Sequence, residues 1–558
     1  MDGHCLSHML SRNDRPSNRH PYLLRDLFGT PREAGAVNAT PSEPVGGLRT
    51  VTDTNGKISI IANGVLNVAT GAANFDGVWY PSMIRKLGRT VIGTVIPSET
   101  VNFVLRFGWD IDIAGNVADA LILGTGGILS VTYNATTNFG VGAYTAAQYR
   151  LCVIERENGA FFLIRGGVFE KWTLLAIVSL GNTNTIYPAA NISTATVGTL
   201  DNFLVPSRLF IPYPIASDSF AGSDGSMTGR LTDGLGQAES GGAGLAWETP
   251  GNTWTIASNA AVNTPTQGAE MFTDPGLEGN YTAGLNDNLT KIGSPIVSQS
   301  ADVHGGSKAQ EFTGVAANDR IQQAQTLIVG TWYRASCWAK RTVIATNRAV
   351  FNLLATPVGS NLVLTDAAYT QKIIIERATI TGGSVRVAVS QSTLCDTVIV
   401  DDVSLTALSI SSCFSSLFLS TVNVTGEWVI KTLVPISQAG CVLRLDDPDS
   451  PANFLILYWD GSGNIKLDEC VAGVYTNKMS VVKAYATGDK LVPWLSGSAW
   501  RIYHVTAAGV ATLLGSGTTT VVTGNYVGNF NTYEGNAIES CNVFAVGNEG
   551  QWEGLSLL

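Results

Sequence analysis

The sequence contains few charged residues for its length. Asp, Glu, Lys and Arg make up only 14% of its 558 residues, whereas glycine occurs 60 times. Long surface helices need outer faces rich in Lys and Glu, so this composition favours strands joined by turns. A chain of this length is also too long for one hydrophobic core. We therefore expect an all-β protein made of several domains.

Basic clusters and long apolar runs are missing as well. The net charge is −10, and the main arginine-containing stretch near the N-terminus, residues 11–26, is interrupted by acidic residues. Binding to a nucleic-acid backbone needs clustered Lys and Arg, and a membrane-spanning helix needs about eighteen consecutive apolar residues. The first twenty residues also lack the apolar core of a secretory signal. We expect no nucleic-acid partner, no membrane insertion and no export by the general secretion pathway.

The eight cysteines follow no metal-binding or redox spacing. None of them forms a CxxC pair, which excludes the usual zinc and thioredoxin-like patterns. Cys337 and Cys395 both lie in strand-like stretches. The sequence leaves open whether these two form a disulfide or stay, like the others, as buried thiols.

Three phrases occur twice along the chain, in the same order. The first pair is KISIIANGVLNV (57–68) and TWTIASNAAVNT (253–264), the second FVLRFGWDID (103–112) and CVLRLDDPDS (441–450), and the third GTLDNFLV (198–205) and ESCNVFAV (539–546). Apolar residues alternate in the first pair up to a shared Asn, which predicts a strand, a turn and a second strand. The common order indicates two copies of one domain.

The spacing of these phrases differs between the two copies. The first two phrases begin at residues 57 and 103 in one copy and at 253 and 441 in the other. The second copy therefore contains an insertion, which starts near FTDPGLEGN (272–280). Turns tolerate inserted domains whose chain ends lie close together. We predict tandem β-sandwich (jelly-roll) domains, one nested inside another: an N-terminal arm (1–45), a first sandwich (46–210), a second sandwich (216–270 plus 409–558) and an inserted jelly roll (271–408).

The insert has its own series of phrases, DPGLE, HGGSKAQEF, YRASCWAK and DDVSL. In this series it resembles the carbohydrate-binding modules of families 4, 9 and 22, which are eight-stranded jelly rolls. The resemblance implies a structural calcium held by Glu278 and Asp401, with Asp402 as a substitute. Calcium prefers several oxygen ligands. The alternative is that these carboxylates only accept hydrogen bonds from turn amides.

The two flanking copies resemble laminin-G-like (concanavalin-A-like) sandwiches. In the second copy the matching phrases are DSFAGSDGSMTGRLTD, TWTIASNAAV and VLRLDDPDSPANFLILYWD. The first copy keeps the last two phrases and has VGGLRTVTDTNG (45–56) in place of the first. Its resemblance is therefore the weaker of the two.

A sugar site needs flat aromatic rings on an exposed face or loop, together with polar groups for the hydroxyls. The candidates in the insert are Tyr281, Trp332 and Tyr333. Trp332 and Tyr333 are neighbours in a strand and point to opposite faces, so at most one of them is exposed. We assign Trp338 to the core.

No catalytic set is evident. Glycoside hydrolysis needs a pair of carboxylates at a defined separation, and retaining glycosidases with a laminin-G-like fold place them on one strand as Glu-x-Asp-x-x-Glu, a phrase that does not occur. The nearest phrase, WDID with Asp110 and Asp112, reads as a solvated turn. GxSxG and HExxH are absent. We predict a protein that is not an enzyme.

Exterior-type modules without a secretion signal are typical of virions, which assemble in the host cytoplasm. The predicted function is that of a tailed-phage structural protein on the virion surface (tail fibre, minor tail protein or capsid decoration), used for attachment or reinforcement. The expected partners are other virion proteins through the N-terminal arm and host-surface polysaccharide, and the expected assembly is a homo-oligomer or a lattice-bound form, since strand edges can pair between subunits. The alternatives are a secreted bacterial adhesin or filament protein that binds polysaccharide and, third, a polysaccharide-degrading enzyme.

Overall fold

The computed structural model describes residues 22–547, Trp552 and Leu555, with gaps at 63–64, 69–75, 84–85, 111–116, 134–136, 157–158, 179–185, 193–197, 208, 211–213 and 234–243. These residues form strands and three short 3-10 helices but no α-helix, so the predicted all-β fold class is confirmed. None of their helices is long and apolar enough to cross a membrane. The predicted arm up to residue 21, with Cys5, lies outside the described residues, as does Asp112.

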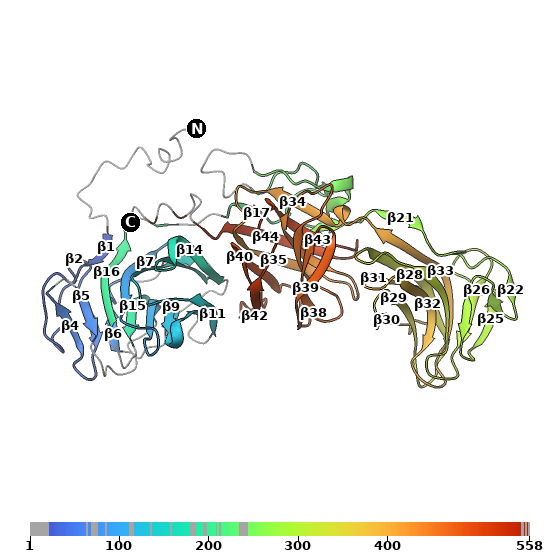
Figure 1. Cartoon of the computed structure of the whole chain (residues 1–558), viewed down its shortest axis with the longest axis horizontal. Helices are drawn as coiled ribbons and strands as arrows, with labels where there is room; N and C mark the ends of the chain where they lie inside the picture. The colour runs from blue at the N-terminus through green and yellow to red at the C-terminus, as the bar shows by residue number, and fades with distance from the viewer. Residues whose placement is uncertain are drawn as a thin grey trace.

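Three β-sandwiches lie in a row, with the first sandwich at one end, the host sandwich in the middle and the insert at the other end (Figure 1). The first sandwich has two antiparallel sheets, which we name after one strand of each. The β16 sheet has the order β14 (Phe169–Val178), β13 (Gly159–Gly166), β12 (Tyr149–Arg156), β7 (Thr90–Pro97), β16 (Gly198–Pro206), β1 (Tyr22–Asp26), β2 (Pro44–Val45), with β4 (Ile58–Ile61) and β5 (Val65–Val68) at its side. The β8 sheet has the order β11 (Thr137–Ala143), β10 (Ile128–Tyr133), β9 (Val117–Gly124), β8 (Leu105–Asp110), β15 (Tyr187–Ile192), β6 (Asp76–Trp79), β3 (Thr50–Thr52).

The host sandwich repeats this arrangement. Its β44 sheet has the order β42 (Ala511–Thr518), β41 (Ala499–Val505), β40 (Lys490–Ser496), β35 (Val424–Thr432), β44 (Ala537–Ala545), β20 (Ala261–Asn263), β19 (Trp254–Ile256), β18 (Gly225–Ser226), and β17 (Ala216–Asp218) pairs with β44. Its β36 sheet has the order β39 (Val474–Val482), β38 (Asn464–Val471), β37 (Phe454–Trp459), β36 (Ala439–Leu445), β43 (Tyr526–Asn531), β34 (Phe414–Phe418). The path β14-β13-β12-β7-β16-β1 in the first sandwich thus corresponds to β42-β41-β40-β35-β44-β17 in the host. The three repeated phrases fall on corresponding strands of the two copies.

Between β20 and β34 the insert contributes two larger sheets and a two-stranded sheet of β22 (Tyr281–Thr282) and β23 (Leu285–Asn286). The β28 sheet has the order β25 (Ile296–Ser300), β26 (Ala309–Thr313), β33 (Thr397–Leu408), β28 (Trp332–Val343), β31 (Thr370–Arg377), with β21 (Gln267–Glu270) paired to β33. The β32 sheet has the order β24 (Thr290–Ile292), β27 (Arg320–Thr326), β32 (Gly382–Ser390), β29 (Ala349–Leu354), β30 (Ser360–Val363). Because β21 pairs with β33, the insert starts at residue 267, four residues earlier than predicted. Apolar side chains such as Phe312, Phe351 and Ile374 fill the space between its sheets.

The first sandwich closes around a buried ion pair. Asp26, at the end of β1, accepts hydrogen bonds of 2.6 Å from Nε and Nη2 of Arg49, and both side chains are fully buried. The hydroxyl of Tyr80 and the N–H of Phe28 donate to the same carboxylate at 2.8 and 3.0 Å. Because β1 pairs with β16, and β2 with β1, residues 22–45 belong to this sandwich. The predicted arm boundary at residue 45 is therefore wrong.

The host sandwich contains the same arrangement. Asp218, at the end of β17, accepts hydrogen bonds from Arg230 at 3.0 Å, from the indole of Trp247 at 2.7 Å and from the N–H of Phe220 at 2.8 Å. The phrases Asp-Leu-Phe (26–28) and Asp-Ser-Phe (218–220) are thus equivalent. The first copy therefore does have an opening phrase like that of the second copy. It lies at residues 26–28, upstream of residues 45–56, which the sequence analysis had compared with the opening phrase of the second copy.

The disulfide alternative is wrong. Cys337 and Cys395 are both free and buried, as are the other cysteines in the described part of the chain. Burial raises the pKa of the Cys337 thiol, which keeps it protonated and unreactive.

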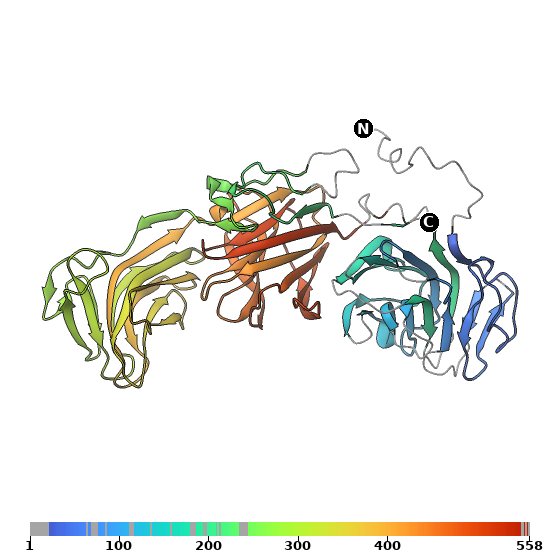
Figure 2. The same cartoon turned by 180° about the vertical axis from the view of Figure 1, so that it is seen from behind.

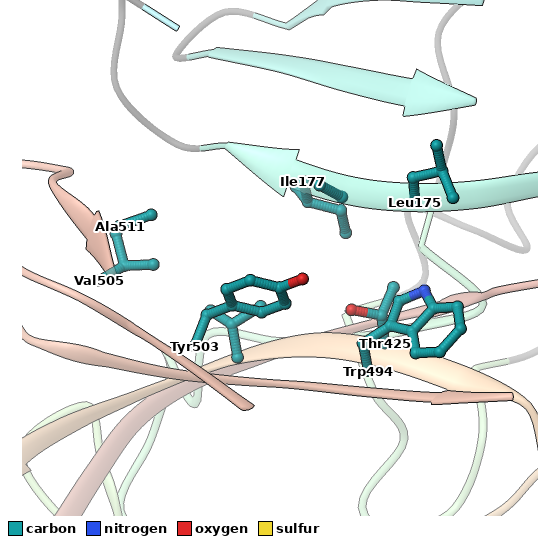
Figure 3. Close-up of a pocket in the computed structure, with 9 residues that line it drawn as sticks. Leu175, Ile177, Thr425, Trp494, Tyr503, Val505 and Ala511 are labelled. Atoms are coloured by element: carbon teal, nitrogen blue, oxygen red, sulfur yellow. The ribbon is translucent and has the colours of Figure 1, made fainter. Parts of the chain in front are cut away.

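The first sandwich and the host share an apolar interface (Figure 3). Leu175 and Ile177 of β14 face Trp494 of β40 and Tyr503 of β41 across it. The indole N–H of Trp494 donates to the carbonyl of Leu174 at 2.8 Å. The cavity that remains has a volume of about 10 Å³, which is room for about one water molecule. This region is a packing interface and not a ligand site.

The insert packs against the other side of the host. Trp332 of β28 and Ile373 and Ile375 of β31 join one apolar cluster with residues of the β36 sheet, among them Phe414 and Phe530. Seen from behind, the insert again lies beyond the host and away from the first sandwich (Figure 2). The insert is therefore docked on the host by a packed apolar contact as well as by its two chain connections.

Candidate functional site

Glu278 holds one side of the loop formed by residues 304–308. Its Oε1 accepts hydrogen bonds from the N–H groups of Ser307 at 2.6 Å and Lys308 at 3.0 Å, and its Oε2 accepts one from the Ser307 hydroxyl at 2.6 Å. The Ser307 hydroxyl and these amides lower the pKa of Glu278. The carboxylate is therefore ionised at neutral pH and fixes the loop.

Asp401 and Asp402 of β33 hold the other side of this loop. Asp401 Oδ2 accepts from the N–H groups of His304 at 2.8 Å and Gly305 at 3.1 Å, and burial raises the pKa of Asp401. Asp402 Oδ2 lies 2.6 Å from Nδ1 of His304. The carboxylates thus contact turn amides, as the alternative to calcium described. In the described part of the chain no three or more His, Cys, Asp and Glu side chains are grouped so that they could hold a metal ion, and calcium stays a prediction.

His304 connects the carboxylates to a group of aromatic rings. Its ring stacks on the indole of Trp338, with centroids 3.8 Å apart and an angle of 10° between the planes. The ring of Tyr369 meets His304 edge-on at 5.6 Å, and the ammonium of Lys340 lies 4.7 Å from the centroid of the Tyr369 ring. The outer face of the β28 sheet therefore carries an aromatic patch, which we define as His304, Trp338 and Tyr369.

The position of Trp338 corrects a prediction. Ala335, Cys337 and Ala339 of β28 point into the core of the insert, so the alternation of a strand places Trp338 on the outer face. Trp338 is half-buried and is not a core residue as predicted. The small inward residues on either side of it were the signal in the sequence that could have shown this.

The three residues predicted to bind a ligand are buried or half-buried. Trp332 and Tyr333 are only 3% and 1% exposed, because Trp332 packs on the host and Tyr333 lies in the insert core. Tyr281 of β22 (Tyr281–Thr282) is half-buried, and its hydroxyl donates to the carbonyl of Leu277 at 3.0 Å. Neither Trp332 nor Tyr333 lies on an exposed face, so neither offers the exposed ring that the sequence analysis required. His304 and Tyr369, which lie in turn-rich stretches far apart in the sequence, were missed.

The outer face of the β32 sheet is polar instead of aromatic. Gln322, Arg386, Asn352 and Asn361 stand directly opposite one another on four neighbouring strands. Buried atoms without a hydrogen-bond partner occur at Asn352 Oδ1 and Arg386 Nε. Burial, and to a lesser extent the neighbouring Arg320, lowers the pKa of Arg386. Asn352 is only 1% exposed, so Gln322, Arg386 and Asn361 are the members of this row that a polar ligand can reach, and none of them offers a flat aromatic ring for stacking.

No family model and no curated protein matches the chain. Solved structures that are similar include the CBM22-1 xylan-binding domain from Paenibacillus barcinonensis, with 12% identity over 26% of this chain and 97% of that chain and a TM-score of 0.21. They also include the carbohydrate-binding module CBM66 from Bacillus subtilis, with 16% identity over 24% and 79% and a TM-score of 0.18. A xylan β-1,4-xylosidase from Bacillus halodurans C-125 matches with 8% identity over 94% and 90% and a TM-score of 0.21. These scores are too low to support a conclusion about the ligand or the activity of this chain.

Proposed function

We propose that the chain is a non-enzymatic binding protein whose insert takes carbohydrate on the aromatic patch of the β28 sheet. The observation that carries the proposal is the stacked pair of His304 and Trp338 on an outer sheet face, next to charged groups. The apolar faces of sugar rings stack on flat aromatic rings, while their hydroxyls exchange hydrogen bonds with a few polar side chains. The patch supplies both kinds of contact.

The polar groups around the patch are held in place before a ligand arrives. Lys340 forms an ion pair with Asp302, and the hydroxyl of Tyr369 donates to the carbonyl of Asp302 at 2.8 Å. The ring of His304 is fixed by Asp402. Such preorganisation reduces the entropy that is lost when a ligand binds. The patch thus supports binding of a neutral sugar chain with little rearrangement.

The test is binding of the full-length chain to an array of defined oligosaccharides. We expect the substitution Trp338→Ala to weaken binding to any positive glycan at least about tenfold, about 1.4 kcal/mol. The control is Phe418→Ala, which removes a 52% exposed ring from the host and is expected to leave binding unchanged. Equal binding by the Trp338→Ala protein, or the absence of any positive glycan, would contradict the proposal.

We further propose that this binding serves a tailed-phage virion, with the chain as a surface component. The placement of the insert at one end of the row of sandwiches supports this, because its β28 sheet, which carries the aromatic patch, lies away from the first sandwich (Figure 1). The test is electron microscopy of particles labelled with an antibody against residues 271–408. Regularly spaced label on phage heads or tails is the expected result. Label on cell envelopes or loose filaments would favour the alternative of a secreted adhesin.

Calcium held by Glu278, Asp401 and Asp402 is a separate part of the proposal. Their convergence on the loop 304–308 supports it, since this brings acidic oxygens from the start and the end of the insert to one place. Binding requires the loop to turn its N–H groups away from the carboxylates. A ligand that binds only the folded state raises its stability. Unfolding of the insert at a lower temperature in EDTA is expected, and unchanged unfolding would contradict the calcium site.

A further inference from the structure

A second possible site lies between the insert and the host, away from the aromatic patch. It is a cleft of about 250 Å³. This volume is slightly below the roughly 300–1,000 Å³ that is usual for the site of a drug-sized ligand. Clefts between domains are frequent places for small-molecule binding. The size suits one sugar ring.

The two walls of the cleft come from different domains. Trp332, Glu376 and Arg377 of the insert form one wall, and Tyr458 and Asp468 of the host contribute to the other. The ring of Trp332 and the ring of Tyr458 lie at the edge of the apolar cluster that joins the domains, with centroids 6.0 Å apart. The cleft therefore exists only while the insert is docked on the host.

Hydrogen bonds between the domains fix the geometry of the cleft. Arg377 of β31 donates to Asp468 of β38 at 2.9 Å. The amide of Gln438 donates to the carbonyl of Ile375 at 2.8 Å, and the N–H of Ile375 donates to the carbonyl of Ile436 at 3.0 Å. With these bonds in place, the walls do not need to move together before a ligand binds.

Glu376 is a hydrogen-bond acceptor that lines the cleft. Its Oε1 accepts a hydrogen bond from Thr356 at 3.1 Å, and Ser360 is a second hydroxyl partner of the carboxyl, although Oε2 makes no hydrogen bond of ordinary geometry within the described residues. Burial raises the pKa of Glu376. The Glu376 side chain lines the cleft, and a carboxyl group has more acceptor capacity than two hydroxyl partners use, so a ligand hydroxyl can donate to it.

The charges in the cleft point to a neutral ligand. The acidic groups Asp460 and Asp468 already have cationic partners, Lys466 at 2.9 Å and Arg377 at 2.9 Å. The cleft therefore has no free cation among its described lining residues to attract an anion, and burial raises the pKa of its third acid, Glu376, against the effect of its hydroxyl partners and Lys466. Polar groups at the rim, such as Asn477 and Ser480, can exchange hydrogen bonds with hydroxyls.

We infer that this cleft binds one neutral sugar residue, with its ring near Trp332 and Tyr458 and a hydroxyl donating to Glu376. It forms a binding site in addition to the aromatic patch, and it extends the proposed carbohydrate binding to the junction of the two domains. Trp332, selected from the sequence as a ligand contact, then takes part in binding from the cleft and not from an exposed face.

The test is saturation-transfer NMR on the full-length chain with the methyl β-glycosides of glucose, galactose, mannose, xylose and N-acetylglucosamine as probes. Ser480→Tyr places a large side chain at the rim of the cleft, and Glu376→Gln changes the carboxyl oxygen without a change of shape. The matched control is Val474→Tyr on the same strand, at a residue that is 69% exposed and lies outside the cleft. Near-equal melting temperatures confirm that the variants fold.

The expected result is that at least one glycoside gives a signal, that Ser480→Tyr and Glu376→Gln each weaken its binding at least about tenfold, and that Val474→Tyr leaves it unchanged. Binding that survives both cleft variants but is lost on Trp338→Ala would overturn the cleft site and leave the proposed function intact. Binding lost only in the cleft variants supports the cleft, and the aromatic patch is then tested by the oligosaccharide array alone. No signal from any of the five probes would overturn the cleft site.

Discussion

The two copies of the sandwich differ most on the outer face of one sheet. In the first sandwich the outward residues of β9 include Ala120 and Ile122, whereas β37 of the host has Phe454, Ile456 and Tyr458 on its outer face. The host residues are buried under Trp332 and the neighbouring residues of the insert. The host thus carries aromatic rings on a face where the first sandwich has Ala120 and Ile122, and the insert covers these rings.

This difference shows how the insertion is accommodated. Domains joined only by linkers move relative to one another unless a large apolar interface holds them. Here aromatic rings from both sides contact each other, with Trp332 and Phe530 centroids 5.7 Å apart, and Arg377 adds an ion pair with Asp468. The host therefore differs from its copy in a way that fixes the orientation of the guest and shapes the cleft between them.

The largest expected effect concerns the ion pair that both copies share. Loss of one partner from a buried ion pair costs about 3–5 kcal/mol. We expect Asp26→Ala to destabilise the first sandwich by about this amount, because Arg49 is fully buried. Asp218→Ala is expected to cost less, because the Arg230 side chain is 20% exposed and also lies 3.4 Å from Asp233. Hydrogen exchange measured on individual peptides shows which sandwich loses stability in each variant.

The control for this pair of substitutions is Asp287→Ala, which removes an exposed carboxylate of the insert. This substitution is expected to leave the stability of both sandwiches unchanged. Equal losses for Asp26→Ala and Asp218→Ala would show that the exposure of the arginine does not matter, and the two arrangements would then be energetically equivalent as well as structurally alike.

The next effect concerns the aromatic rings on the outer face of the β36 sheet, which have no counterpart in Ala120 and Ile122 of the first sandwich. Replacement of a buried tryptophan by alanine costs about 3–5 kcal/mol in a core, and we expect Trp332→Ala to cost about 3 kcal/mol because it lies at an interface. Faster hydrogen exchange is expected in β31 of the insert and β43 of the host, with β16 of the first sandwich unchanged. The matched control is Trp338→Ala, which removes a half-buried ring from the same strand. Unchanged exchange in β31 and β43 would mean that the chain connections alone hold the insert.

The sequence was sufficient for the parts of the fold that depend on local pattern. The alternation of apolar residues in residues 57–68 and 253–264 predicted hairpins, and these are β4–β5 and β19–β20. The order of the repeated phrases predicted the duplication, which the strand order shows. The opening phrase of the first copy was missed because its partners, Asp26 and Arg49, are 23 residues apart and only the folded chain brings them together.

The candidate site was predictable only in part. The carboxylates of Glu278 and Asp401 were selected from the resemblance, and they do contact one loop. The aromatic patch was missed because its residues are far apart in the sequence. Trp338 lies in β28 and Tyr369 directly before β31, which pairs with β28. No local pattern shows that His304 contacts both rings. The cleft could not be predicted from the sequence at all, because its walls belong to two domains. Their docking depends on the outer faces of their sheets, which only the folded chain brings together.

The smallest expected effect is a difference in acid sensitivity between the copies. In β10 of the first sandwich Leu129 and Val131 lie in the core, whereas β38 of the host has Leu467 and, two residues later, the buried Glu469. Burial alone raises the pKa of Glu469, but hydrogen bonds from Thr519 and its neighbours together with Lys478 lower it to about 2.

A pKa below the usual value means that the ionised carboxylate stabilises the folded host. This contribution is present above a pH of about 4.5 and is lost as the pH falls towards about 2. Hydrogen exchange or thermal unfolding between pH 5 and pH 2.5 is expected to show the host losing more stability than the first sandwich. Glu469→Gln is expected to lower host stability at pH 7 and to flatten this dependence. If the stability of the host still falls in the same way with pH after Glu469→Gln, another group causes its acid sensitivity. The difference between the two cores would then be one of packing alone.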